Sequence, residues 1–326
     1  MVDRGHSVTL IAPQESRIFS ASRNFGIEGV PLSIGRKNVQ GLTKLKTWFA
    51  ANRPDVVNTH SSTDSWLTAF SCKAPIVRTR HISAPVDAYP WNRWLYGTSA
   101  QRVVTTGESL RLQLINALKL KPEHVVSIPT GIDLKRFTNT KKAQLGIPEG
   151  AFVFGIVATL RSWKGHQYLL DAFSTLQGNF HLVIAGDGPQ RPVLEKRISS
   201  EEKRTNIHLL GQREDVPEVL AALDCFVLPS YANEGVPQAI MQAMAAGLPV
   251  ISTRVGAIDE AVVEGETGIL VPARDPQALA AAMLDLSFSL EKRTSFGKAG
   301  RKVAEQNFSI DRMMDAMEQV FQAAAA

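Results

Sequence analysis

The chain has 326 residues, of which 44% are apolar and 21% are charged. This length is enough for two domains of ordinary size, and the balanced composition excludes fibrous and disordered classes. No apolar run approaches the roughly 20 residues that span a bilayer, and the first residues lack the apolar centre of a signal peptide. The two cysteines are far apart in sequence. A reducing compartment is therefore predicted, and we expect a cytoplasmic location.

Basic residues are concentrated in the first part of the chain. Residues 1–137 contain 18 lysines and arginines against 9 acidic residues, a net charge of +9, whereas the remainder has 18 against 22, a net charge of −4. A basic half suits a surface that meets an anionic membrane or a phosphorylated acceptor. The alternative is a generic solubilising surface, and the sequence does not separate the two.

Short β-branched runs alternate with segments of helical spacing along the whole chain. This alternation predicts an α/β fold with parallel sheets covered by helices on both faces. A polar, turn-rich stretch at 133–150 predicts a domain boundary near residue 138. A last helix is predicted from Ser309 to about Gln322, with an apolar stripe that must be buried. The predicted strands are 7–12, 55–60, 75–80, 102–107, 124–129, 152–160, 181–188, 206–211, 224–230, 248–253 and 268–272.

Ligands bind beyond the carboxyl ends of parallel strands, so the residues there are the most informative. One such exit carries Glu234 and Gly235, and Pro237 is expected at an early position of the helix that follows. The free amides of Val236 and Gln238, with the helix dipole, favour an anion such as a phosphate. Glu234 is itself anionic and suits the hydroxyls of a polyol. The alternative for Glu234 is an ordinary carboxylate near a helix start.

Three further exits carry candidate residues. Arg161 and Lys164 follow one strand and suit a diphosphate, with solvated surface charges as the alternative. Gly186 lies in a Gly-Asp-Gly-Pro turn that lacks the third glycine of the dinucleotide fingerprint, which argues against an NAD-dependent oxidoreductase. Arg213 follows another strand, at an exit that suits the side of a nucleobase.

Two histidines end neighbouring strands of the first half. His60 and His81 are placed to face the same cleft, although an isolated histidine at a strand end is more often a capping or solvent-facing residue. Neither histidine has metal-ligand spacing to a cysteine or an acid, and no Asp-x-Asp motif occurs. The sequence therefore predicts no metal site.

Several motifs together resemble family 4 of the retaining GT-B glycosyltransferases, in the superfamily of glycogen synthase and phosphatidylinositol mannosyltransferase. These motifs are LRSWKG, AGDGP, the Glu-Gly-x-Pro segment with its helix, and AAGLPVISTRVGAIDEAVVEGETGILVP. The resemblance implies two Rossmann-like domains, 1–138 and 139–306, facing across a cleft, and a helix 307–326 that crosses back to the first domain. It also implies a nucleotide-sugar co-substrate held mainly by the second domain, an acceptor held by the first, and no other cofactor or metal ion.

The resemblance assigns a role to each candidate residue. Arg161 and Lys164 grip the diphosphate and stabilise the charge of the leaving nucleotide. Glu234 binds donor-sugar hydroxyls, and His81 is the active-site histidine near the transferred sugar, while His60 fits a less specific position. These four, His81, Glu234, Arg161 and Lys164, are the predicted catalytic residues. The predicted donor-binding residues are Arg161, Lys164, Gly186, Arg213, Gly235, Val236, Pro237, Gln238 and Gln242.

The reaction scheme follows from the same resemblance. The motifs carry no carboxylate for a covalent glycosyl intermediate. The family reacts on one face of the sugar, and the leaving phosphate takes the proton of the acceptor, so the protein supplies positioning and electrostatics.

The sequence departs from the family pattern in three places. Gln242, two turns inside its helix, stands where the family has a second glutamate that binds the ribose, which predicts nucleotide binding weaker by about 1–2 kcal/mol. Thr130 replaces a usual asparagine near the cleft. Family members also open with a strand and a glycine-rich loop, whereas this chain begins MVDRGHSVTLI. We therefore expect a first domain that is truncated at its start, with unpaired strand edges.

The predicted function is retaining transfer of a hexose or N-acetylhexosamine from a nucleotide-diphosphate sugar to a saccharide or lipid-linked saccharide. Envelope polysaccharide or lipopolysaccharide synthesis is the expected context, with the protein in the cytoplasm or peripheral on the inner face of the cell membrane. No nucleic-acid partner is expected. The alternative is a truncated, non-catalytic binder of nucleotide sugars or saccharides. A nucleotide-sugar epimerase fits Arg161, Lys164 and Glu234 less well.

Overall fold

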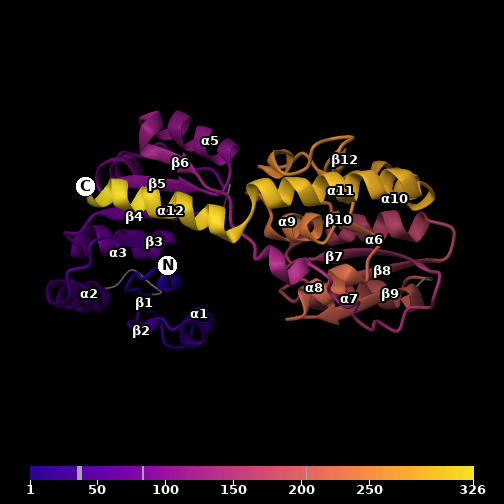
Figure 1. Ribbon diagram of the computed structural model, residues 1–326, viewed down its shortest axis with the longest axis horizontal. Coiled ribbons are helices and arrows are strands. Elements are labelled where there is room, and N and C mark those ends of the chain that lie inside the picture. The colour runs from indigo at the N-terminus through magenta and orange to yellow at the C-terminus, as the bar shows by residue number, and fades with distance from the viewer. Residues whose placement is uncertain (35–38, 83, 203) are drawn as a thin grey trace. The chain divides into compact units, whose positions relative to one another are not determined.

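The computed structural model describes residues 1–34, 39–82, 84–202 and 204–326, which form two compact units (Figure 1). The first unit comprises Met1–Ile128 and Met314–Ala326, and the second comprises Pro129–Met313. The domain limits predicted from the sequence stay predictions. Within the four described ranges, no helix combines the length and the apolar character that crossing a bilayer requires.

The described residues of the first unit form six short parallel strands in two sheets. β1 pairs with β2, and a separate sheet has the order β3-β4-β5-β6. Among the described residues, β1 and β3 each have a strand partner on one side only. The expectation of a first domain that is truncated at its start stays a prediction. The strands are β1 Thr9–Ala12, β2 Glu28–Pro31, β3 Val57–Thr59, β4 Ile76–Arg80, β5 Arg102–Thr105 and β6 Val125–Ser127.

Helices cover these sheets, and one of them starts at a well-defined cap. The Ser61 side chain accepts a hydrogen bond from the Asp64 amide, and the Asp64 carboxylate accepts bonds from the Ser61 and His60 amides, so a capping box fixes the start of α3. Because His60 directly follows β3, the cap also fixes the backbone of a candidate residue. The helices are α1 Arg17–Ser22, α2 Val39–Asn52, α3 Ser62–Ser71, α4 Pro90–Arg93, α5 Glu108–Leu118 and α12 Ile310–Ala325, and the shorter turns are Val2–Arg4, Arg23–Phe25, Trp94–Thr98 and Pro122–His124.

The second unit is built on one six-stranded parallel sheet with the order β12-β11-β10-β7-β8-β9. Three of its strands, β8, β10 and β11, are buried along their whole length, as expected for a parallel sheet covered on both faces. The strands are β7 Phe152–Val157, β8 Phe180–Ala185, β9 Ile207–Gly211, β10 Cys225–Leu228, β11 Val250–Thr253 and β12 Gly268–Val271.

The strand order of this sheet reverses at its centre. From β7 the chain proceeds outward to β8 and β9, and from β10 it proceeds outward in the opposite direction to β11 and β12. Helix α6 packs with α10, and α9 packs with α11. The loops that leave β7 and β10 therefore lie at the point where the strand order reverses, which is where α/β sheets bind ligands. The helices are α6 His166–Thr175, α7 Arg191–Ser199, α8 Val216–Ala221, α9 Gln238–Ala245, α10 Pro276–Phe288 and α11 Leu290–Asn307, with shorter turns Leu134–Phe137, Ser162–Lys164, Arg204–Asn206 and Ile258–Glu260.

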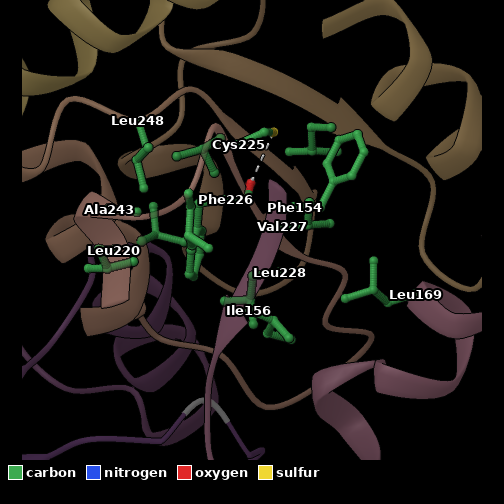
Figure 2. Packing of buried hydrophobic residues seen from close by; sticks show 14 of the residues in the cluster. Phe154, Ile156, Leu169, Leu220, Cys225, Phe226, Val227, Leu228, Ala243 and Leu248 are labelled. Carbon is green, nitrogen blue, oxygen red and sulfur yellow. Dashed lines mark hydrogen bonds between the residues drawn. The ribbon is translucent and has the colours of Figure 1, made fainter. Parts of the chain in front are cut away.

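The core of the second unit surrounds its two central strands. Figure 2 shows side chains of β7 and β10 meeting those of α6, α8 and α9, among them Phe154, Phe226 and Leu169. The thiol of Cys225 lies in this core, and burial raises its pKa well above the usual range. Cys225 and Cys72 are both free thiols.

The fold confirms most of the elements predicted from the sequence. Each of the eleven predicted runs contains a strand, and the last helix extends to Ala325. The strand that the sequence did not predict is β2, because its residues Glu-Gly-Val-Pro combine a glycine and a proline, both poor strand formers. Residues 314–326 of α12 belong to the first unit, where Arg4 and His6 bond to Glu318.

Two arginines of the first unit donate hydrogen bonds to the same hydroxyl group. Arg78 and Arg80 lie two residues apart on β4, and they donate to the Tyr96 hydroxyl at 3.1 Å and 3.0 Å, respectively. The Arg78 guanidinium also lies 4.0 Å from the centroid of the Tyr96 ring. Within the described ranges neither arginine forms an ion pair with a carboxylate. The hydroxyl is therefore the acceptor that the two guanidinium groups share, and Arg80 also donates to the Ala84 carbonyl.

Tyr96→Phe should destabilise the first unit, because it leaves two buried guanidinium donors without their shared acceptor. We expect a loss of about 1–3 kcal/mol in the free energy of unfolding, measured by urea denaturation. Tyr89→Phe is the matched control: this hydroxyl is on an exposed side chain, and its removal should change stability by less than about 0.5 kcal/mol. Equal stability of the two variants would contradict the assignment.

Candidate functional site

Two loops meet at the centre of the second unit, where the strand order reverses. One loop follows β7 and carries Trp163, Lys164 and Gly165; the other follows β10 and begins at Pro229. A Cβ atom on Gly165 would overlap the Pro229 carbonyl, and Gly165 has a positive φ of 77°, so glycine permits this close approach. The Tyr231 amide donates to the Trp163 carbonyl at 2.8 Å. The two loops are thus held against each other by their backbones.

A buried ion pair joins the same loops. The Lys164 Nζ atom lies 2.7 Å and 3.0 Å from the two carboxylate oxygens of Glu234, which is only 4% exposed. The Ser230 hydroxyl donates a further bond of 2.6 Å to Oε1 of Glu234. Sequence reasoning gave Lys164 and Glu234 separate ligands and did not pair them. The structure shows that each compensates the charge of the other.

The backbone beneath Glu234 is fixed by the neighbouring strand. Gly256, with φ of 65°, packs on the Glu234 carbonyl so closely that any Cβ there would overlap it. The Thr253 hydroxyl, at the end of β11, donates to the Ser230 carbonyl. Ser230 is fully buried and was not predicted as a site residue. The sequence offered one indication of its role, its position four residues before Glu234. That spacing predicts a hydrogen bond to the carboxylate only once the loop conformation is known.

Helix α9 presents unpaired amides beside this ion pair. Within the described part of the chain, the amides of Gly235, Val236 and Gln238 donate no hydrogen bond, so they remain available to an anion. Pro237 was predicted inside the helix, which is wrong: its ψ of 124° is extended, and it is the N-cap residue. Gln242 is the fifth residue of the helix and half-buried, so it lies little more than one turn inside rather than two.

Arg161 adds a second cation to the β7 exit. It is exposed at the residue before the turn Ser162–Lys164, and its guanidinium lies 5.5 Å from the centroid of the Trp163 ring. A side chain held by one aromatic contact keeps all five of its N–H donors for a ligand. Two cations and a row of free amides at one edge of the sheet suit a diphosphate.

Gly186 and Arg213 already have partners within the second unit. A Cβ atom on Gly186 would overlap the Ala158 carbonyl, and its amide donates to the Gly211 carbonyl at 2.7 Å, which gives this glycine a packing role. Arg213 makes two bonds to the Asp215 carboxylate, and this pairing lowers the pKa of Asp215. Donor contacts for Gly186 and Arg213 stay predictions.

His60 and His81 lie side by side in the first unit. They follow the neighbouring parallel strands β3 and β4, and Nδ1 of His60 lies 3.0 Å from Nε2 of His81, with the rings stacked. The two rings are therefore adjacent, and the prediction that they face a shared cleft stays a prediction. Burial lowers the pKa of both rings, and for His81 the neighbouring His60 lowers it further. A pair that shares one hydrogen bond resists double protonation.

His166 is a buried histidine that sequence reasoning did not single out. It is the first residue of α6, two positions after Lys164, and only 2% exposed. Neither ring nitrogen makes a hydrogen bond of normal geometry within the described residues. Burial, followed by the charge of Lys164, lowers the pKa of His166 to about 4, against an opposing effect of the Arg161 carbonyl. The ring is therefore neutral at neutral pH.

The described ranges contain no cluster of three or more histidine, cysteine or acidic side chains with the geometry to hold a metal ion. The β7 and β10 exits offer two cations, free main-chain amides and a carboxylate at one edge of the sheet, a set of groups that suits a diphosphate and a polyol.

Comparisons with known proteins identify the class of protein to which the chain belongs. The family model described as glycosyl transferases group 1 matches residues 137–303, and the model described as glycosyltransferase family 4 matches residues 1–136. The D-inositol 3-phosphate glycosyltransferase of Corynebacterium efficiens is 30% identical over 292 residues, which cover 78% of this chain and 68% of that protein. The chain therefore belongs to the GT-B glycosyltransferases of family 4.

Two further proteins extend the likeness. The UDP-Gal:alpha-D-GlcNAc-diphosphoundecaprenol alpha-1,3-galactosyltransferase of Escherichia coli is 27% identical over 263 residues, covering 73% of this chain and 68% of that protein. The crystal structure of Anabaena Alr3699/HepE in complex with UDP-glucose has a TM-score of 0.84 at 19% identity, covering 97% of this chain and 91% of that chain. The chain spans about two thirds of the length of the Corynebacterium efficiens and Escherichia coli relatives.

Lys164→Met should strongly destabilise the second unit, because the buried Glu234 carboxylate would keep only the Ser230 hydroxyl as a partner. We expect a loss of about 3 kcal/mol in the free energy of unfolding, measured by urea denaturation. The double variant Lys164→Met/Glu234→Gln removes the unpaired charge and should regain at least half of this loss. A single variant as stable as the wild type would show that the pair is not coupled.

Stability should fall as the pH falls from 7 to 5, in part through His166. In the unfolded chain this histidine takes up a proton near pH 6.5, whereas in the fold its pKa is about 4. The unfolded state therefore binds more protons in this interval, which lowers the free energy of unfolding by about 2 kcal/mol at pH 5 relative to pH 7. His166→Leu should show a pH dependence smaller by about that amount. An unchanged dependence in this variant would contradict the assignment.

Proposed function

We propose that the protein is a retaining hexosyltransferase that uses a nucleotide-diphosphate sugar and needs no metal ion. One observation carries this proposal: Arg161, Lys164 and the free amides of Gly235, Val236 and Gln238 are positioned by the same two loops. Donors of this kind neutralise the charge that develops on a leaving diphosphate, a role that a metal ion has in other enzymes.

The buried ion pair would change partners when the donor binds. A diphosphate attracts the Lys164 ammonium, and a sugar offers hydroxyl donors to the Glu234 carboxylate. The Ser230 hydroxyl keeps Glu234 in place during this exchange, because its bond runs to the same carboxylate at 2.6 Å. We therefore assign Lys164 and Arg161 to the diphosphate, Glu234 to the sugar, and Gln242 to the ribose as a neutral hydrogen-bonding partner.

The first unit is proposed to bind the acceptor and to supply His81 as the active-site histidine, oriented by His60. A lipid-linked or free saccharide is the proposed acceptor. Support comes from the basic first half of the sequence and from the Escherichia coli relative, whose name specifies a diphosphoundecaprenol acceptor. Envelope polysaccharide or lipopolysaccharide synthesis, in the cytoplasm or peripherally on the inner face of the membrane, is the proposed setting.

The experiment that tests this function is a panel of UDP-, GDP- and ADP-sugars, assayed for hydrolysis and for transfer, with and without EDTA. We expect turnover of one donor class that EDTA does not reduce, with the anomeric configuration retained in the product. Binding without turnover of any donor would instead indicate a non-catalytic nucleotide-sugar binder. Loss of turnover on EDTA treatment would contradict metal independence.

Arg161→Ala should lower kcat by about 100-fold, because it removes a cation that acts on the developing charge of the leaving group. The matched control is Arg204→Ala, an exposed arginine in the turn that precedes β9, at the amino end of the sheet. This control should keep wild-type turnover. Full activity of Arg161→Ala, or an equal loss in the two variants, would show that the diphosphate does not bind at the β7 exit.

A further inference from the structure

Five aromatic side chains of the first unit gather on adjacent elements. Trp66 and Phe70 lie one turn apart on α3, and Trp94 opens the turn Trp94–Thr98. The ring centroids are 5.9 Å apart for Trp66 and Phe70, 5.3 Å for Phe70 and Trp94, and 5.9 Å for Trp66 and Trp94. Tyr89 and Trp91, at the start of α4, stack at 4.5 Å. We refer to these five residues as the aromatic face.

Much of the aromatic face is open to solvent. Phe70 is 55% exposed, Trp91 is 53% exposed and Tyr89 is 49% exposed. Trp91 and Trp94 are three residues apart in continuous helical backbone, so they lie on the same side of it, and Trp94 contacts Phe70. Soluble proteins expose single apolar side chains freely, but a contiguous set of large aromatic rings marks an interaction surface.

Cations surround this surface. Among residues 39–102, which include α2, α3 and α4, five lysines and arginines are exposed but only two acidic residues within the described ranges. Lys73, just after α3, and Arg93, within α4, are exposed and form no ion pair within the described ranges. A third acidic residue, Asp64, is engaged by backbone amides at the start of α3. Helices α2 and α3 pack side by side (Figure 1), and Lys44 and Lys46 of α2 are exposed.

Tryptophan, tyrosine and neighbouring cations form the combination that settles at the interface of an anionic bilayer. The aromatic rings favour the headgroup level, and each basic residue is attracted by the negative surface potential. A second copy of the chain fits poorly, because self-association would bring the same cations together. We propose that the aromatic face docks this protein on a bilayer that contains anionic phospholipids.

This inference rests on the proposed peripheral location, and it explains how an enzyme without a spanning helix in its described ranges would reach a lipid-linked acceptor. The test is co-sedimentation with vesicles of pure phosphatidylcholine and of phosphatidylcholine with 30% phosphatidylglycerol, in the absence of donor and acceptor. Because no turnover is measured, a failure of the proposed reaction and a failure of docking give separate results. We expect binding to the anionic vesicles that is at least about tenfold stronger and that weakens as salt is raised.

Two double variants remove the aromatic and the electrostatic contributions to vesicle binding separately. Phe70→Ser/Trp91→Ser and Lys73→Glu/Arg93→Glu should each lower the vesicle partition coefficient about tenfold or more. The matched control is Phe288→Ser/Lys298→Glu, which changes an exposed phenylalanine and an exposed lysine in the second unit and should bind as the wild type does. Unchanged thermal unfolding of every variant separates loss of docking from loss of folding.

Three results would overturn the proposal. The first is wild-type binding by both double variants of the aromatic face. The second is equal binding to neutral and anionic vesicles. The third is a wild-type dimer in light scattering that becomes a monomer in Phe70→Ser/Trp91→Ser while vesicle binding is absent, since the face would then be a contact between copies of the chain.

Discussion

The ion pair between Lys164 and Glu234 is the interaction on which the donor side of this protein depends. Each charge is buried or nearly so, and a buried charge is tolerated only when it is paired and hydrogen-bonded. The Ser230 hydroxyl provides the third contact to the carboxylate. Before the donor arrives, the two groups satisfy each other. Under the proposed function, a phosphate and a sugar would then take over the two partners, so the free protein keeps both charges in place without leaving either one uncompensated.

The sheet topology explains why these two residues meet. They are 70 positions apart in sequence, but the strands β7 and β10 that lead to them are adjacent in the sheet, and the loops that follow these strands meet where the strand order reverses. Glycine at 165 and 256 lets the loop backbones approach each other and the backbone of Glu234. The fold thus creates a region where ammonium, guanidinium and main-chain N–H groups gather. The proposed function assigns the diphosphate of the donor to this region.

Much of this arrangement could be predicted from the sequence, and the rest follows only from tertiary contacts. The strands could be predicted because apolar β-branched runs alternate with helical segments, and Arg161, Lys164 and Glu234 could be predicted because they lie in the loops that follow strands. The pairing of Lys164 with Glu234 could not be predicted, because each residue considered alone suits a ligand: a diphosphate for Lys164 and sugar hydroxyls for Glu234. Ser230 and His166 escaped notice since a serine or a histidine near a strand exit is ordinary until its burial is known. The strand β2 was missed because its glycine and proline mask its extended conformation.

A crystal structure of the protein with bound UDP would test the central claim most directly. The account predicts that phosphate oxygens lie within hydrogen-bond distance of Lys164 Nζ and of the amides at 235–238, with Arg161 turned toward the same group and Glu234 still bonded to Ser230. A diphosphate bound elsewhere, with Lys164 and Glu234 still paired as in the free protein, would contradict it.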